Sequence, residues 1–430
     1  MSPSPAFLYA AIRTPFGRYG GALSGIRPDD LASTVLTALL TRAPGLDPAA
    51  IGEVVMGNAN GAGEENRNVA RMAVLLAGLP VSLPATTVNR LCGSSLDAAM
   101  ISSRLVETGD AEIAIAAGVE SMSRAPWVVP KPSRAFPAGS ETLVSTTLGW
   151  RLVNPAMPEE WTISLGEANE RLRERFGISR ERQDEFAARS HRLADQAWRE
   201  GFYDDLTCAV PGTLLARDEA IRADTSAAAL AAIKPAFRPD GTITAGNASP
   251  LNDGASALLI ASEQAAQAIG GPPLARLAGR GTAAVEPQMF GYAPVEAANR
   301  ALRAAGIGWP DVSAVELNEA FAVQSLACID AWKVKSRDRE REGRSHRHRS
   351  PAGRIRRPDS RHTRISAART PWPLGSRRYL HRRRPGASRS ARKPGHGMTP
   401  PARPEMGRTI EAHPAIGRWH CERPREPLRG

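Results

Sequence analysis

Cysteine, histidine and aromatic residues are all scarce in this chain of 430 residues. The four cysteines are widely separated, so they form neither a disulfide framework nor a metal-binding cluster, and we expect no metal site. No run of about 18 or more apolar residues occurs, which argues against a membrane-spanning helix. The opening residues Met1-Ser2-Pro3-Ser4 lack the charged and then apolar pattern of a secretion signal. We therefore expect a soluble, cytoplasmic protein.

Charge is distributed unevenly along the chain, and so is histidine. Residues 333–430 contain 25 arginines and 3 lysines against 8 acidic residues, although the net charge of the whole chain is only +12. Residues 1–332 are therefore mildly acidic, whereas the rest is strongly basic and rich in Pro, Ser and Gly. Of the 8 histidines only His191 precedes residue 335. It stands in a polar helical stretch, and we interpret it as a solvated surface residue.

The pattern of apolar residues predicts layered α/β structure. Short apolar runs, such as residues 113–117 and 257–260, alternate with longer segments of helical periodicity. One of these segments, residues 180–199, is polar and predicts an exposed helix. Alternating strands and helices are typical of α/β folds, and the length of the chain allows two or more domains.

Cys92 is the first candidate for chemistry. It stands in Val88-Asn89-Arg90-Leu91-Cys92-Gly93-Ser94-Ser95-Leu96, and a helical pattern follows until Gly109. A thiol just before a helix N-terminus faces unpaired N–H groups and the positive end of the helix dipole, which favour the reactive thiolate. A buried structural cysteine is the alternative, and the local context alone leaves both readings open.

The Cys92 segment resembles the acyl-accepting cysteine motif of thiolases. Residues 246–255 (GNASPLNDGA) and 318–321 (NEAF) look like two further thiolase signatures, in the order and spacing of the family. Residues 13–17 (RTPFG) and 117–123 (AGVESMS) also fit. Five matches between residues 13 and 321 identify the chain as a member of the thiolase family.

The resemblance implies a fold of two similar α/β halves in a layered sandwich, with an inserted loop domain. The N-terminal half would comprise residues 1–120 and 246–272, the loop domain residues 121–245, and the start of the C-terminal half residues 273–334. It also implies that Cys92 forms an acyl-enzyme. Thiolases convert a 3-oxoacyl-CoA and CoA to an acyl-CoA and acetyl-CoA, or catalyse the reverse condensation. Asn318 would hold a water molecule in an oxyanion hole.

Coenzyme A is the expected substrate, and no permanently bound cofactor is implied. A run at residues 149–155 (GWRLVNP) resembles thiolases that act on 3-oxoadipyl-CoA, while acetoacetyl-CoA and longer 3-oxoacyl-CoA substrates stay open. The resemblance implies a homo-oligomer, a dimer or tetramer, for the intact form of the protein, and neither a membrane nor nucleic acid as partner. Seven residues fall where the family contacts coenzyme A: Arg222, Ala236, Phe237, Ala245, Ser249, Met289 and Phe321.

Two thiolase motifs are missing from the sequence. In the family, a histidine in a Gly-His-Pro turn activates the nucleophile, and a cysteine in a Cys-x-Gly-Gly-Gly run moves the second proton; neither run occurs here. Read one base later, the codons of residues 349–359 are compatible with the Gly-His-Pro turn. Those of residues 378–387 are compatible with the Cys-x-Gly-Gly-Gly run. We therefore predict a shift of reading frame close to Val334.

On this interpretation residues 335–430 are an out-of-frame basic tail, which we expect to be disordered. The chain as written would keep its nucleophile and be catalytically incomplete, because the activating histidine and the second cysteine are lost. The alternative is a protein without enzymatic function: either a frameshifted product, or a chimera whose basic tail binds nucleic acid through its phosphates.

Overall fold

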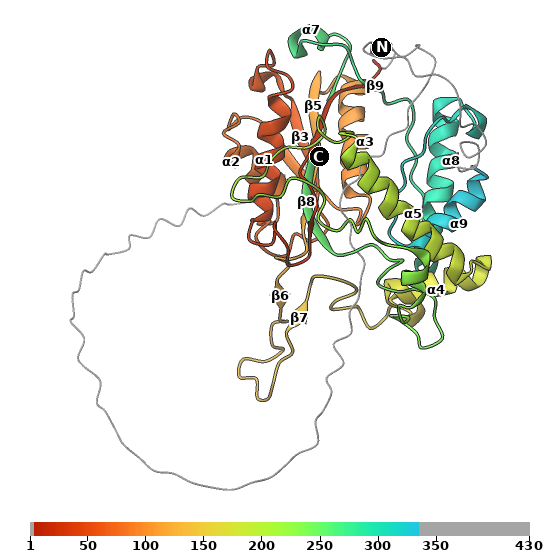
Figure 1. Ribbon diagram of the computed structural model, residues 1–430. Coiled ribbons are helices and arrows are strands. Elements are labelled where there is room, and N and C mark those ends of the chain that lie inside the picture. The colour runs from red at the N-terminus through yellow and green to blue at the C-terminus, as the bar shows by residue number, and fades with distance from the viewer. Residues whose placement is uncertain (1–3, 335–430) are drawn as a thin grey trace, which may run out of the picture. The chain divides into compact units, whose positions relative to one another are not determined.

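The computed structural model describes residues 4–334 (Figure 1). Within this part of the chain, the main feature is a mixed β-sheet whose path runs β4-β3-β5-β8-β1-β9, with β2 paired to β8. The predicted runs at 113–117 and 257–260 lie inside two of its strands, so these predictions are confirmed. The strands are β1 (Phe7–Arg13), β2 (Gly17–Arg18), β3 (Glu53–Gly57), β4 (Ala85–Val88), β5 (Ile113–Ser121), β8 (Asn252–Ala261) and β9 (Ala275–Arg276).

The directions of the strands define the edge of the sheet at which the site lies. β3 is parallel to β4 and to β5, with Gly57 opposite both Val88 and Gly118. β8 is antiparallel to β5, and Asp253 near its start is opposite Ser121 at the end of β5. The carboxyl ends of β3, β4 and β5 and the amino end of β8 therefore meet at one edge of the sheet.

Helices bury both faces of this sheet. α1 (Pro28–Leu40) and α2 (Val69–Leu76) cover one face, and α3 (Ser94–Thr108) covers the other (Figure 1). An apolar core lies on each face of the sheet, and successive residues of β5 point into one core and then the other. Ile113 and Ile115 pack on the α1 side, and Ala114 and Ala116 pack on the α3 side. A strand buried on both faces needs apolar residues at every position, which explains the continuous run in the sequence.

The long connection between β5 and β8 is polar and partly helical. It contains a small hairpin, β6 (Trp127–Val128) and β7 (Val144–Ser145), then α4 (Leu165–Phe176), α5 (Arg180–Arg199) and α6 (Ala227–Ala231). The side chains of Ser164 and Ser179 accept hydrogen bonds from backbone N–H groups and cap α4 and α5. The helix predicted at residues 180–199 is confirmed.

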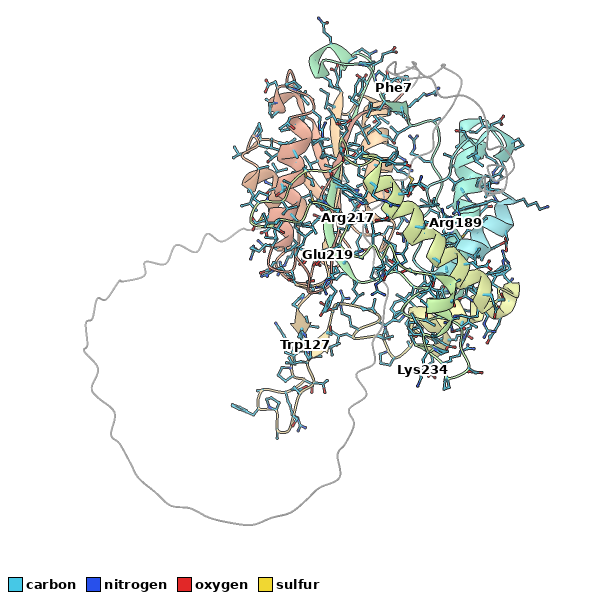
Figure 2. All side chains as sticks on the ribbon, in the orientation of Figure 1. Phe7, Trp127, Arg189, Arg217, Glu219 and Lys234 are labelled. Atoms are coloured by element: carbon cyan, nitrogen blue, oxygen red, sulfur yellow. The ribbon has the colours of Figure 1, made fainter. Side chains whose placement is uncertain are left out.

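Two acidic residues late in this connection attach it to the N-terminal strands. Asp218 accepts two hydrogen bonds from the guanidinium of Arg13, at 2.8 and 3.1 Å. Glu219, labelled in Figure 2, accepts from the backbone N–H groups of Arg18 and Ala22. These bonds hold residues 218–219 of the connection close to β1 and β2.

Three further helices follow β8: α7 (Ala266–Ile269), α8 (Ala293–Ala305) and α9 (Ala322–Trp332). Short 3-10 turns occur before β8 at η1 (Pro48–Ala50) and η2 (Glu159–Trp161), and after it at η3 (Pro287–Tyr292) and η4 (Trp309–Asp311). Helix α9 packs against α4, α5 and α8, and its residues Val323 and Ala327 belong to an apolar cluster together with Leu172 of α4. None of the helices between residues 4 and 334 is both long and apolar enough to cross a membrane. The predicted out-of-frame tail, residues 335–430, lies outside the described residues.

Candidate active site

Cys92 lies in the turn that connects β4 to α3. Helix α3 begins at Ser94 with Gly93 as its N-cap, so the predicted position of Cys92 just before a helix is confirmed. The residue before it, Leu91, has a left-handed backbone with φ of 48°, an unfavourable conformation for a side chain of this size. Leu91 N–H donates to Asn89 Oδ1 at 2.9 Å, and Leu91 O accepts from Ser94 Oγ at 2.6 Å. These bonds hold the turn in its strained form.

The same turn is held against the end of β3 by a close approach at Gly57. A Cβ atom at this position would lie 2.3 Å from the backbone carbon of Ser94 and from the nitrogen of Ser95. Only glycine therefore allows α3 to begin so close to β3. The contact fixes the start of the helix, and with it Cys92, relative to the sheet.

The electrostatic environment of Cys92 differs from the prediction. Burial, with a smaller effect from the nearby carboxyl of Glu120, raises the pKa of the Cys92 thiol to about 12, although the backbone N–H of Cys92 opposes the shift. The helix terminus was predicted to favour the thiolate, but desolvation is the larger effect. Within residues 4–334 the thiol forms no hydrogen bond to a side chain that could act as a base.

Glu120 is a site residue that the sequence reasoning did not single out. Its side chain is 4% exposed and accepts hydrogen bonds from Ala59 N–H at 2.9 Å and Asn58 Nδ2 at 3.3 Å. Burial raises the pKa of Glu120 to about 7; Glu65 adds to this shift and Arg151 opposes it. The available signal was a carboxyl group within β5, directly after its apolar residues.

The other two thiolase signatures lie side by side. Ser249 N–H donates to Ala320 O, and Ala322 N–H donates to Asn247 O, each at 2.9 Å. Since residues 246–251 lead directly into β8, both segments lie near the sheet edge at which β4 ends and the Cys92 turn begins. Asn318 is exposed, and no hydrogen bond within the described residues joins it to Cys92.

Several of the residues predicted to contact coenzyme A lie in or beside one apolar cluster. Phe237, Met289 and Phe321 belong to a single apolar cluster, and the rings of Phe237 and Phe321 are 6.4 Å apart at 65°. Ala236 stands beside Phe237, and its N–H donates to Ile243 O. Ser249 is half-buried next to the same cluster. Phe321 is only 1% exposed, which limits the area that it could offer to a ligand.

Ala245 and Arg222 of the same set are exposed. The backbone N–H of Arg222 donates to Nδ1 of His191 at 3.3 Å. His191 is half-buried, and its pKa is lowered by burial and by the Arg222 charge, so its prediction as a solvated surface residue was wrong. Its ring is close to Arg222 because α5 packs against the loop before α6.

Comparison with known proteins decides the family. The family model described as "Thiolase, N-terminal domain" matches residues 6–264, and the model "Thiolase, C-terminal domain" matches residues 271–344. The chain belongs to the thiolase family. The resemblance drawn from the five sequence motifs is confirmed, and so is the predicted layered α/β fold.

Several named proteins are similar to this thiolase. It is 49% identical over 332 residues to "Beta-ketoadipyl-CoA thiolase" of Escherichia coli, covering 75% of this chain and 82% of the relative. It is 47% identical over 330 residues to the protein of the same name from Pseudomonas aeruginosa, with the same coverage.

Solved structures agree with these relatives. The acetyl-CoA acetyltransferase of Bacillus anthracis superimposes with a TM-score of 0.72 at 35% identity, over 78% of this chain and 84% of that protein. Human mitochondrial 3-ketoacyl-CoA thiolase in complex with CoA also gives a TM-score of 0.72, at 33% identity, over 77% and 83% of the two chains. The described residues of this thiolase therefore share the fold of both enzymes.

Proposed function

We propose that this thiolase moves acyl groups between coenzyme A thioesters through a covalent intermediate on Cys92. The thiolate attacks the 3-oxo carbon of a 3-oxoacyl-CoA, the bond between C2 and C3 breaks, and its electron pair stays on C2. Protonation of C2 releases acetyl-CoA, and the thiol of a second CoA takes the acyl group from the sulfur. The observation that carries the proposal is the position of Cys92 at the sheet edge shared with the loops before β8 and α9.

The substrate that we propose is a 3-oxoacyl-CoA with a second carboxylate, of the 3-oxoadipyl-CoA type. Relatives 49% and 47% identical carry the name beta-ketoadipyl-CoA thiolase, and residues 149–155 support the same choice. Coenzyme A would lie against the cluster of Phe237 and Met289 near Ser249. Asn318 would position the water that donates to the oxyanion.

We further propose that the chain as written does not complete the reaction. A thiol with a pKa near 12 is protonated at neutral pH, so it needs a base to remove its proton. No Gly-His-Pro turn occurs in the sequence, and His191 is the one histidine of the described residues. The nucleophile is therefore present without the group that activates it.

Two versions of the gene test these claims together. One is the gene as written, and in the other the codons after Val334 are read one base later. We expect thiolysis of 3-oxoadipyl-CoA by the second product and a rate lower by roughly a thousandfold or more for the first. Cys92→Ser in the second frame is the control and should abolish turnover. An inactive second product contradicts the proposed reaction, whereas turnover by the chain as written contradicts only its incompleteness.

We also propose a cytoplasmic location and a homo-oligomeric state for the product of the restored frame. The support is the family membership of the chain. Native mass spectrometry of the restored product would show dimers or tetramers. A monomer at micromolar concentration would contradict the oligomer.

A further inference from the structure

We propose that Arg151 binds the distal carboxylate of a dicarboxylic acyl group attached to Cys92. This inference rests on the proposed acyl-transfer function and names the residue that would select its substrate. A succinyl group on the sulfur ends in a carboxylate only two methylene groups from the thioester carbonyl. The cation that recognises it must therefore lie in the immediate surroundings of Cys92.

Three consecutive residues connect Arg151 to the Cys92 turn. Ala59 O accepts a hydrogen bond at 2.8 Å from the side chain of Asn89, which itself caps the strained residue before Cys92. Ala59 N–H and Asn58 Nδ2 donate to the buried carboxyl of Glu120. Asn60 Oδ1 accepts from the guanidinium of Arg151 at 3.1 Å. Residues 58–60 therefore contact the Cys92 turn, the buried carboxyl of Glu120 and the guanidinium of Arg151.

The orientation of Arg151 is set by Asn60. Asn60 is 8% exposed, and its Nδ2 donates to the carbonyl and the hydroxyl of Thr146 at 3.1 and 3.0 Å. This arrangement leaves Oδ1 facing Arg151. Arg151 is half-buried, and its guanidinium uses one N–H for this bond, so further donors remain for a planar carboxylate.

Arg151 also differs from its arginine neighbours in charge balance. Arg90, beside Cys92, forms an ion pair with Asp97 at 3.0 Å, and Arg124 pairs with Glu64. Among the described residues Arg151 forms no such pair, and its hydrogen-bond partner is a neutral amide. The nearby carboxyl of Glu120 has a pKa raised to about 7 by burial, so much of it is uncharged at neutral pH. The positive charge is therefore available to an incoming carboxylate.

A purely structural role would be to clamp the segment after β7 onto Asn60. Such a clamp would affect all acyl-CoA ligands alike, whereas recognition of the carboxylate would affect only the charged ones. Succinyl-CoA and butyryl-CoA separate the two roles, because both carry four-carbon acyl groups and only the first ends in a carboxylate.

The experiment uses the full chain with Cys92→Ser, which removes the thiol and so prevents acyl transfer to sulfur, and measures Kd by calorimetry. We expect succinyl-CoA to bind about tenfold more tightly than butyryl-CoA, as for one charge-assisted hydrogen-bonded pair. Arg151→Gln should abolish this preference and leave the Kd of butyryl-CoA within about twofold. Arg134→Gln, at an exposed position between β6 and β7, is the matched control and should keep the preference.

Three results would count against the proposal. Equal binding of the two ligands by the parent chain, or a preference that survives Arg151→Gln, overturns the role of Arg151 and leaves the coenzyme A site intact. Failure of the parent chain to bind either ligand contradicts the coenzyme A site itself and removes this inference with it. Weaker binding of both ligands by Arg151→Gln would show the clamp and not recognition.

Discussion

Glu120 is a carboxyl group that the fold removes from water while giving it two hydrogen-bond donors, Ala59 N–H and Asn58 Nδ2. Folding raises its pKa from 4.5 to about 7, so between these values the folded chain holds a proton that the unfolded chain releases. The contribution of Glu120 to the free energy of unfolding therefore falls as pH rises through this range, and stays constant above it.

Glu120→Gln should remove this dependence on pH, because an amide does not ionise and its oxygen can still accept from Ala59. We compare the free energy of unfolding of the variant with that of the parent. As pH rises from 5 to 8, this difference should shift in favour of the variant by at most about 2 to 3 kcal/mol. Urea unfolding at both pH values measures the change. Glu141→Gln, in an exposed loop, is the control and should show no such gain. An equal effect of Glu120→Gln at both pH values would contradict the assigned pKa.

At the scale of elements, the junction between β3 and α3 depends on one missing side chain. Gly57→Ala would place a methyl group against the backbone of Ser94 and Ser95, and neither can move without shifting the start of α3. We expect a loss of about 1 to 3 kcal/mol in free energy of unfolding. Gly25→Ala, where nothing lies within 4 Å of the added carbon, should change it by less than about 0.5 kcal/mol. Similar losses in both variants would show that the close approach does not matter.

The elements themselves were largely predictable. β5, β8, α5 and the helix after Cys92 follow from apolar periodicity and helix-terminus signals, which are properties of neighbouring residues. The arrangement of the site was not predictable in this way. Glu120 and Asn58 are 62 residues apart, and the order of strands depends on pairing between distant segments. The direction of the Cys92 pKa shift depends on burial, which the local sequence does not reveal.

At the scale of the whole molecule, one apolar cluster joins two stretches of the chain that are far apart in sequence. It combines Leu172, Ile178 and Ile243 from the long connection between β5 and β8 with Phe321 and Val323 at the start of α9. Phe321 is one of its members and is nearly inaccessible to solvent. The described helices after β8 are therefore anchored to the connection through this side chain.

Phe321→Ala should cost about 3 to 5 kcal/mol in free energy of unfolding, because it leaves a cavity among residues from both stretches. Phe136→Ala, at a position 92% exposed, is the control and should be nearly neutral. Urea unfolding of both variants measures the difference. If Phe321 served only to contact coenzyme A, its removal would weaken ligand binding and leave the urea midpoint unchanged.

The place of β1 in the sheet has a consequence for synthesis on the ribosome. β1 is the first strand to be translated, yet both of its neighbours, β8 and β9, come after residue 251. β3, β4 and β5 can pair with one another as soon as residue 121 has emerged. Arg13 can bond to Leu206 and Cys208 earlier, but the other backbone N–H and C=O groups of β1 must wait for more than half of the chain. Pairing between such distant segments is slow. During that interval the newly made chain carries an unpaired strand, for which a chaperone or a second nascent chain can compete.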